Sequence, residues 1–226
     1  GTQWTSFNRS VGPTFAGNWW AEQADTKDVI TWSPESMFRY TVLQAGTNTD
    51  GLGIQWAAGP YAGGGFEKNV VATMSTVGNY IAPIEESINN TFPSTSYPTA
   101  AKSTIAGLQW GVATRSTDDA YEYIHVLKAP NTKQLTLPAP KDGKLFGNAT
   151  LLSNGHAVAL DQNVDGVTLT LDSADSWNSN DTVIKLTVVG KGSNLALGKL
   201  VYASSSVDSD VDRWGMQKIT DGIYES

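Results

Sequence analysis

A short apolar segment, a glycine-rich turn and an amphipathic helix follow one another within residues 49–81, and this order restricts the fold more than any other feature. The apolar segment covers about 52–58, the loop covers 59–65, and a helical pattern starts near Phe66. A strand that enters a helix through a tight loop is typical of a βα unit in a parallel sheet. Because no earlier βα units precede it in this sequence, the pattern predicts the closing part of an α/β domain.

The residues before this unit predict a long loop and a first helix. Residues 1–32 are irregular and rich in tryptophan and phenylalanine, and long loops in compact domains are usually functional. Ser33 has the character of an N-cap and Pro34 suits the first helical position. We expect this helix to end at Gly46, where glycine would terminate it.

The second helix has one apolar face, formed by Val70, Met74, Val77 and Ile81. Pro83 lacks an amide hydrogen and is expected to kink or interrupt this helix. The sequence therefore predicts two amphipathic helices around one buried strand.

Beyond about residue 105 the apolar pattern changes to the period of two that indicates strands. Turn dipeptides separate the segments, among them Asn154-Gly155 and Asp165-Gly166. This spacing predicts an antiparallel β-sandwich. The candidate strands are 105–113, 120–127, 133–137, 144–152, 157–161, 166–171 and 182–189.

The chain is thus expected to combine an α/β part with an all-β part. Residues 1–92 would be the C-terminal portion of a (β/α) barrel, and 93–102, with two prolines, an interdomain linker. Residues 103–192 would form the β-sandwich domain. Residues 193–226 are too few to bury a core alone and would be the start of a further β module or an ordered tail.

Composition excludes several classes of partner. The net charge is −7, and no basic stripe is present to neutralise phosphates, so we expect no nucleic acid. No window approaches eighteen apolar residues, so we expect no membrane insertion. The eight tryptophans and eight tyrosines suit proteins that handle sugars. Secretion is favoured by four Asn-X-Ser/Thr sequons, at Asn8, Asn89, Asn148 and Asn180.

No motif for a metal or a cofactor stands out, and none is predicted. His125 and His156 lack acidic residues at metal-ligand spacing, so structural histidines are the better interpretation. The loop 59–65 lacks the Lys-Ser/Thr of a phosphate loop. The alternating acidic residues Asp208 to Asp212 suit a solvated loop better than a calcium site.

The remaining candidate is a sugar pocket. Ligands of parallel barrels bind at the carboxyl ends of the strands, which directs attention to Gln55 and Trp56. Trp19 and Trp20 would fold inward from the N-terminal loop, with Glu22 beside them. Trp56 could equally well pack in the core of the barrel or stack against a sugar. For Glu22, a solvated position on the surface is the better interpretation. A lone carboxylate cannot complete the pair that a glycosidase needs.

Three parts of the sequence resemble parts of known proteins, in the order barrel end, β-sandwich and carbohydrate-binding module. The strand and turn LGIQWAAGP and the helix end NYIAPIEESI resemble the last barrel unit of the α-L-fucosidases of glycoside hydrolase family 29. The stretches GLQWGVATRSTDDAYEYIHVL, LTLPAP, ATLLSNGHAVAL and GVTLTL resemble that family's C-terminal β-sandwich. The end, NLALGKLVYASSS followed by ITDG, resembles the opening of a discoidin-like carbohydrate-binding module.

This resemblance implies retaining hydrolysis of terminal α-L-fucose from glycans, without a cofactor. The nucleophilic aspartate and the acid/base glutamate would precede Gly1, because one subgroup carries the glutamate just before a phrase like residues 2–6. The partner would then be the N-terminal catalytic chain of the same precursor. Residues 57–60, Ala-Ala-Gly-Pro, depart from the family's Asn-Ile-Gly-Pro, so no role is assigned to an asparagine there.

Two other classes stay open at this point. The first is a non-catalytic carbohydrate-binding β-sandwich protein, which explains why no pair of catalytic carboxylates is found. It does not explain the strand, loop and helix predicted within residues 50–81, because a β-sandwich module needs no such unit. A structural adhesin fragment is favoured only by the sequons and the Ser/Thr content.

Overall fold

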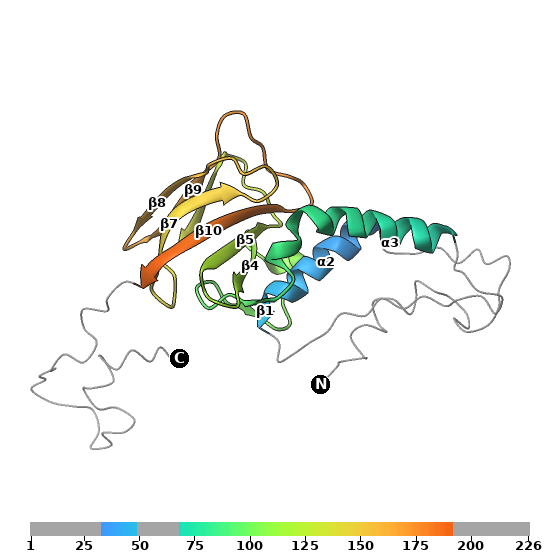
Figure 1. Cartoon of the computed structure of the whole chain (residues 1–226), viewed down its shortest axis with the longest axis horizontal. Helices are drawn as coiled ribbons and strands as arrows, with labels where there is room; N and C mark the ends of the chain where they lie inside the picture. The colour runs from blue at the N-terminus through green and yellow to red at the C-terminus, as the bar shows by residue number, and fades with distance from the viewer. Residues whose placement is uncertain (1–32, 49–67, 192–226) are drawn as a thin grey trace, which may run out of the picture.

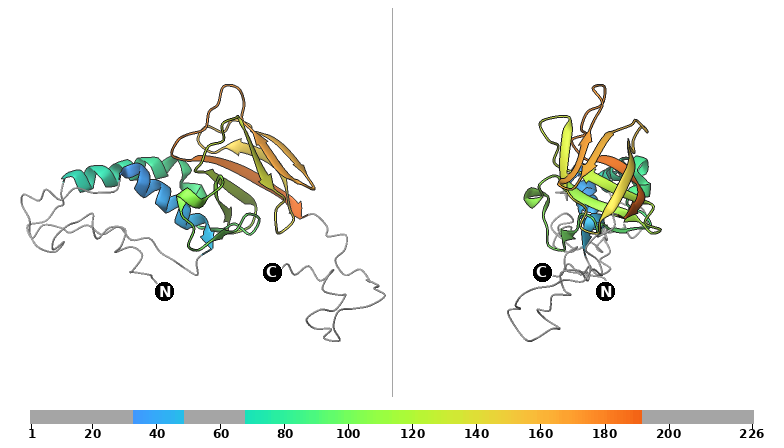
Figure 2. Two further views of the ribbon diagram at one scale, coloured as in Figure 1. Left: turned by 180° about the vertical axis from the view of Figure 1, so that it is seen from behind. Right: turned by 90° about the vertical axis from the view of Figure 1, so that its left-hand side faces the viewer.

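The computed structural model describes residues 33–48 and 68–191, which form a helical layer, a five-stranded sheet and a three-stranded sheet (Figures 1 and 2). Four α- or 3-10-helical segments of the described part precede the first long strand, and strands then follow one another to the end of the described part. The elements are α2 (Pro34–Gly46), β1 (Thr47–Asn48), α3 (Lys68–Ile81), η2 (Ala82–Ser87), β2 (Thr91–Pro93), β3 (Thr99–Ala100), η3 (Ile105–Gly107), β4 (Gly111–Ser116), β5 (Tyr121–Val126), β6 (Gln134–Pro138), β7 (Lys144–Leu151), β8 (Ala159–Asn163), β9 (Gly166–Thr170) and β10 (Thr182–Lys191).

Helix α2 begins where the sequence predicts. Pro34 is its first residue, and the Ser33 hydroxyl accepts a hydrogen bond from the Ser36 amide at 3.1 Å. The helix also ends at Gly46, but for a different reason from the one expected. Gly46 stays helical and buried, and a Cβ placed on it would lie 2.5 Å from the Val112 side chain. Glycine is needed there because α2 approaches β4 closely.

Helix α3 buries only part of the face that its pattern predicts. Val77 is buried and Ile81 is half-buried, whereas Met74 is exposed. The interruption at Pro83 is confirmed, because the α-helix stops at Ile81 and the chain continues as the 3-10 helix η2.

The two sheets confirm the predicted antiparallel sandwich. The larger sheet has the order β2-β4-β5-β10-β7 and the smaller one β6-β9-β8, and every pairing within them is antiparallel. Within the described residues the only parallel pairing joins β1 to β3, two residues each, and no barrel is present. The core between the sheets includes Ile124, Leu137, Phe146, Val167 and Leu186.

Both faces of the five-stranded sheet are covered, which explains why β5 is buried along most of its length. Ile124 and Val126 point into the core between the sheets. Tyr123 points to the opposite face and packs in a second core with Phe38 of α2 and Val77 of α3. The helices therefore lie against the outer face of the sandwich as one further layer (Figure 2).

The stretch 93–102, expected to be a linker, is packed against the sheet. Its first residue, Pro93, ends β2, which pairs with β4. Ser94, Ser96 and Tyr97 are buried, and Tyr97 contacts the Trp110 ring edge-to-face at 6.2 Å. The connection is therefore an ordered part of the fold, in which Pro93 belongs to a strand.

Candidate functional site

The residues expected to form a sugar pocket lie outside the described part of the chain. These are Trp19, Trp20, Glu22, Gln55 and Trp56. Asn8, the acidic residues Asp208 to Asp212 and the segment that resembles a discoidin-like module lie outside it as well. These assignments stay predictions.

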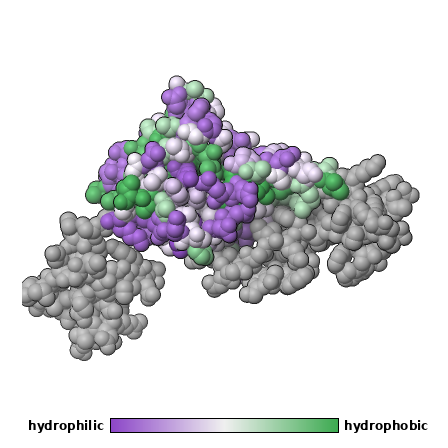
Figure 3. Space-filling view, in the orientation of Figure 1, coloured by the Kyte–Doolittle hydropathy of each residue, from purple (hydrophilic) through white to green (hydrophobic). Residues whose placement is uncertain are grey.

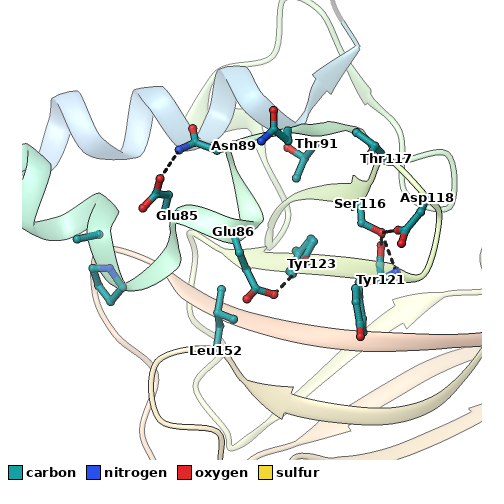
Figure 4. Close-up of a pocket in the computed structure, with 13 residues that line it drawn as sticks. Glu85, Glu86, Asn89, Thr91, Ser116, Thr117, Asp118, Tyr121, Tyr123 and Leu152 are labelled. Atoms are coloured by element: carbon teal, nitrogen blue, oxygen red, sulfur yellow. Dashed lines mark hydrogen bonds between the residues drawn. The ribbon is translucent and has the colours of Figure 1, made fainter.

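The described residues form an open cleft of about 700 Å³ between η2 and the turn that joins β4 to β5 (Figure 4). In Figure 4, Glu85 and Asn89 lie on one wall, Ser116 and Asp118 lie on the other, and Glu86 and Tyr123 lie between them. The remaining lining residues are Ala82, Pro83, Asn90, Thr91, Thr117, Tyr121 and Leu152. The cleft is therefore polar, with three carboxylates.

Two of these carboxylates are held as anions. Glu86 accepts hydrogen bonds from the Lys185 ammonium at 2.6 Å and the Tyr123 hydroxyl at 3.0 Å, and the bond from Lys185 lowers the pKa of Glu86. The Ser116 hydroxyl, 2.6 Å from Asp118, and the Ala120 amide lower the pKa of Asp118.

This electrostatic environment is the opposite of the one that a glycosidase acid needs. A general acid of glycoside hydrolysis has a raised pKa, so that it carries a proton at neutral pH. Glu86 and Asp118 have lowered pKa values and stay ionised. The third carboxylate, Glu85, accepts a hydrogen bond from the Asn89 amide at 2.9 Å. Neither Glu86 nor Asp118 therefore has the electrostatic environment of a general acid.

Burial raises the pKa of one other carboxyl, Glu122, but no substrate could reach it. The buried Lys144 ammonium lies 3.0 Å from Glu122, 2.8 Å from Asp119 and 3.4 Å from Asp142. The Ser94 hydroxyl also donates to Glu122. This network is structural, and sequence reasoning missed it because its members are far apart in the chain.

His125 has the structural role that the sequence predicts. It is fully buried, and its Nδ1 lies 2.7 Å from an Asp181 oxygen while its Nε2 lies 3.4 Å from the Ser87 carbonyl oxygen. The Thr114 hydroxyl donates to the same carbonyl at 2.6 Å. These contacts join the end of η2 to the sheet. The hydrogen bond between His125 and Asp181 could not be predicted from the sequence, because the two residues are far apart in the chain.

His156 is exposed, and its Nδ1 lies 2.9 Å from Asp175. Trp110 and Trp177, the tryptophans of the described part, are both half-buried against the core, and the Trp177 indole donates to the Thr132 carbonyl at 2.7 Å. Neither ring is a free stacking platform.

The three described sequons differ in accessibility. Asn89 is exposed on the cleft wall, and Asn148 is exposed where β7 bulges against β10. Asn180 is half-buried, and the hydroxyl of its sequon partner Thr182 accepts the Asn178 amide at 2.6 Å. Asn89 and Asn148 are therefore more accessible for N-glycosylation than Asn180.

Acidic and histidine side chains of the described residues form no group of three that could hold a metal ion. No helix within 33–48 or 68–191 is long and apolar enough to cross a membrane. The surface in Figure 3 is largely hydrophilic, with hydrophobic areas near α3 and at the far end of the sandwich. The exposed large apolar side chains include Val71 and Met74 of α3 and Leu145, Val164 and Val189 of the sandwich.

The fold defines a class of protein in which a helical layer covers one face of an eight-stranded antiparallel sandwich. No family model matches the sequence, and no curated protein matches it. Solved structures do share the fold. One is α-L-fucosidase isoenzyme 1 from Paenibacillus thiaminolyticus, 22% identical over 75% of this chain and 37% of that one, with a TM-score of 0.55.

A second is a family 29 α-L-fucosidase from Bacteroides thetaiotaomicron, trapped as a covalent intermediate with 2-fluoro-fucosyl fluoride. It is 19% identical over 76% of this chain and 36% of that one, with a TM-score of 0.60. The α-fucosidase of Thermotoga maritima is 13% identical over 72% and 36%, with a TM-score of 0.51. At these identities the comparisons establish the fold alone, and they support the antiparallel β part that the resemblance predicts. The chain spans little more than a third of the length of these enzymes.

Proposed function

We propose that this chain is the C-terminal part of a secreted exo-glycosidase that removes terminal α-L-fucose from glycans. The observation that carries the proposal is the shared fold, since α-L-fucosidases of three bacteria match about three quarters of the chain. The order of the sequence motifs, from barrel end to sandwich, supports the same conclusion independently of the structure.

The mechanism that we propose is retaining hydrolysis through a covalent fucosyl intermediate. A related enzyme has been trapped in such an intermediate. In this mechanism one carboxylate attacks the sugar and a second carboxyl protonates the leaving oxygen. Neither Glu86 nor Asp118 suits the role of the acid, because their neighbours lower the pKa of each carboxyl, and Glu122 is enclosed in the fold. The family resemblance of the sequence implies that both catalytic carboxylates precede Gly1, and we assign them to such a preceding segment.

The contribution of this chain would be support and part of the pocket wall. Helices α2 and α3 are expected to close a (β/α) barrel, and the second core packs them against the five-stranded sheet. Trp19, Trp20, Glu22, Gln55 and Trp56 would approach the fucose ring. A methyl group packed on an aromatic face contributes on the order of 1 kcal/mol.

Hydrolysis of 4-nitrophenyl α-L-fucoside tests this proposal. The 226-residue chain alone should release no nitrophenol, whereas a preparation that also contains the preceding segment should release it with retention at the anomeric carbon. Activity in the chain alone would overturn the assignment of the carboxylates. An inactive complete protein would overturn the fucosidase assignment itself.

We further propose that the protein is secreted and N-glycosylated. The sequons at Asn89 and Asn148 support this, because both side chains are exposed. Peptide mapping after expression in a secreting eukaryotic cell should find glycans on these two asparagines. Retention of an unmodified protein inside that cell would contradict the proposal.

A further inference from the structure

We infer that residues 193–202, which follow β10 in the sequence, pack on an apolar patch at the end of the five-stranded sheet. The patch consists of the side chains of Leu145 on β7 and Val189 on β10. In Figure 1, β10 ends beside β7 at the end of the sandwich that points away from α2 and α3. The inference concerns packing within this chain and does not depend on the proposed hydrolysis.

The first argument is the exposure of two large aliphatic side chains on neighbouring strands. Leu145 is 43% exposed and Val189 is 65% exposed. Phe146 and Val188, which are partners across the same two strands, pack into the core between the sheets. Because successive side chains of a strand point to opposite faces, Leu145 and Val189 turn away from that core. A Cβ on Gly147 would collide with the Val189 side chain, so Val189 lies over β7.

The second argument is the place where the described part of the chain ends. Strand β10 ends at Lys191, two residues after Val189. The three residues 192–194 can span about 10 Å, which is enough for the chain to turn back over the patch. Closing so short a loop costs little conformational entropy. Residues 195–202 are rich in the apolar side chains that such a contact needs, namely Leu195, Leu197, Leu200, Val201 and Tyr202.

The third argument is that the outer edge of β7 is already occupied. The Gln162 side chain accepts from the Phe146 amide and donates to the Lys144 carbonyl, both at 2.8 Å. Further along, the Val158 amide donates to the Ala149 carbonyl at 2.9 Å. An added strand would have to displace these hydrogen bonds. The segment 193–202 is therefore expected to contact the patch through side chains and not by extending the sheet.

The fourth argument favours a tethered segment over a separate molecule. A stable interface between two proteins buries roughly 800 Å² on each partner and must offset the loss of translational and rotational freedom. The two side chains of the patch are too small an area for that. A segment joined to β10 loses no such freedom, because the covalent link already holds it near the patch.

The test is limited trypsin digestion of the 226-residue chain, with the products identified by mass spectrometry. Trypsin cleaves after Lys199, inside the proposed contact segment, at a rate that follows the population in which this segment has left the sheet. Val189→Asp and Leu145→Asp each replace an apolar contact with a charge. Either variant should increase the rate of cleavage after Lys199 at least about tenfold.

Two controls separate this contact from general effects of the substitutions. Val71→Asp makes the same chemical change at a half-exposed valine of α3, away from the patch, and should leave cleavage after Lys199 at the wild-type rate. Cleavage after Lys185, in the middle of β10, requires the sandwich to unfold and should stay equally slow in all four proteins.

Four results would overturn the inference. The first is equal cleavage after Lys199 in wild type and V189D, whether fast or slow. The second is the same acceleration in V71D. The third is a parallel rise of cleavage after Lys185, which would mean that the sandwich unfolds. The fourth is a wild-type dimer that V189D converts to a monomer in sedimentation, which would assign the patch to a second copy. None of them bears on hydrolysis, so failure here is distinct from failure of the proposed function.

Discussion

Lys144 lies fully buried at the start of β7, where its ammonium contacts Glu122, Asp119 and Asp142. Burial alone would lower the pKa of Lys144, but the bond to Asp119 and the charge of Glu122 raise it. The ammonium therefore stays charged through neutral pH. Its removal would leave Glu122 as a buried charge with only the Ser94 hydroxyl as a donor.

Lys144→Met should consequently destabilise the protein by about 3 kcal/mol or more, because an unpaired buried charge is costly. Urea unfolding followed by tryptophan fluorescence measures this loss. The matched control is Lys185→Met, whose partner Glu86 is exposed, and it should cost about 1 kcal/mol or less. Equal losses in the two variants would show that the network does not hold the sandwich.

The same network makes stability depend on pH. The hydrogen bond from Lys144 lowers the pKa of Asp119 below its ordinary value of 3.8. A lowered pKa stabilises the folded state above the unfolded-state value, and this contribution disappears as the pH falls through the folded-state value. The stability advantage of wild type over Asp119→Asn should therefore be full at pH 7 and shrink below about pH 3.8. An advantage that grew on acidification would contradict the assignment.

At the scale of elements, the contact between α2 and β4 decides how the helical layer lies on the sheet. Gly46 is the closest point, since a Cβ there would lie 2.5 Å from Val112. Gly78 of α3 serves as a control position, because it is exposed and a Cβ on it would meet nothing within 4 Å.

These two glycines should respond to alanine in opposite directions. Gly46→Ala should destabilise the fold by about 1–3 kcal/mol, since α2 must move off the sheet. Gly78→Ala should stabilise it by about 0.5–1 kcal/mol through helix propensity. Thermal unfolding by circular dichroism gives both values. A neutral or stabilising Gly46→Ala would mean that α2 does not pack this closely.

Local signals predicted most of these elements. Ser33 and Pro34 fix the start of α2, and the period of two identifies β5 to β10 within a few residues. What the sequence could not reveal are contacts between distant positions, such as His125 with Asp181 or Lys144 with Glu122. The role of Gly46 was also hidden, because a helix-ending glycine and a close-approach glycine look alike in sequence.

At the scale of the whole molecule, the helical layer and the sandwich share a sheet with two buried faces. That arrangement fixes the position of α2 and α3 relative to the sandwich. The predicted sugar pocket could be inferred only from the sequence and from the resemblance, because its residues lie outside the described part. The polar cleft had no signal in the sequence, since η2 and the β4–β5 turn come together only through folding.

Covalent labelling with 2-fluoro-fucosyl fluoride tests the central claim most directly. The protein isolated from its source is treated with the reagent, digested and mapped by mass spectrometry. We predict one fucosyl label, on a carboxylate of a peptide that lies outside residues 1–226. A label on a carboxylate within residues 1–226, such as Glu22, would contradict the claim that this chain supports a catalytic centre carried by a preceding segment.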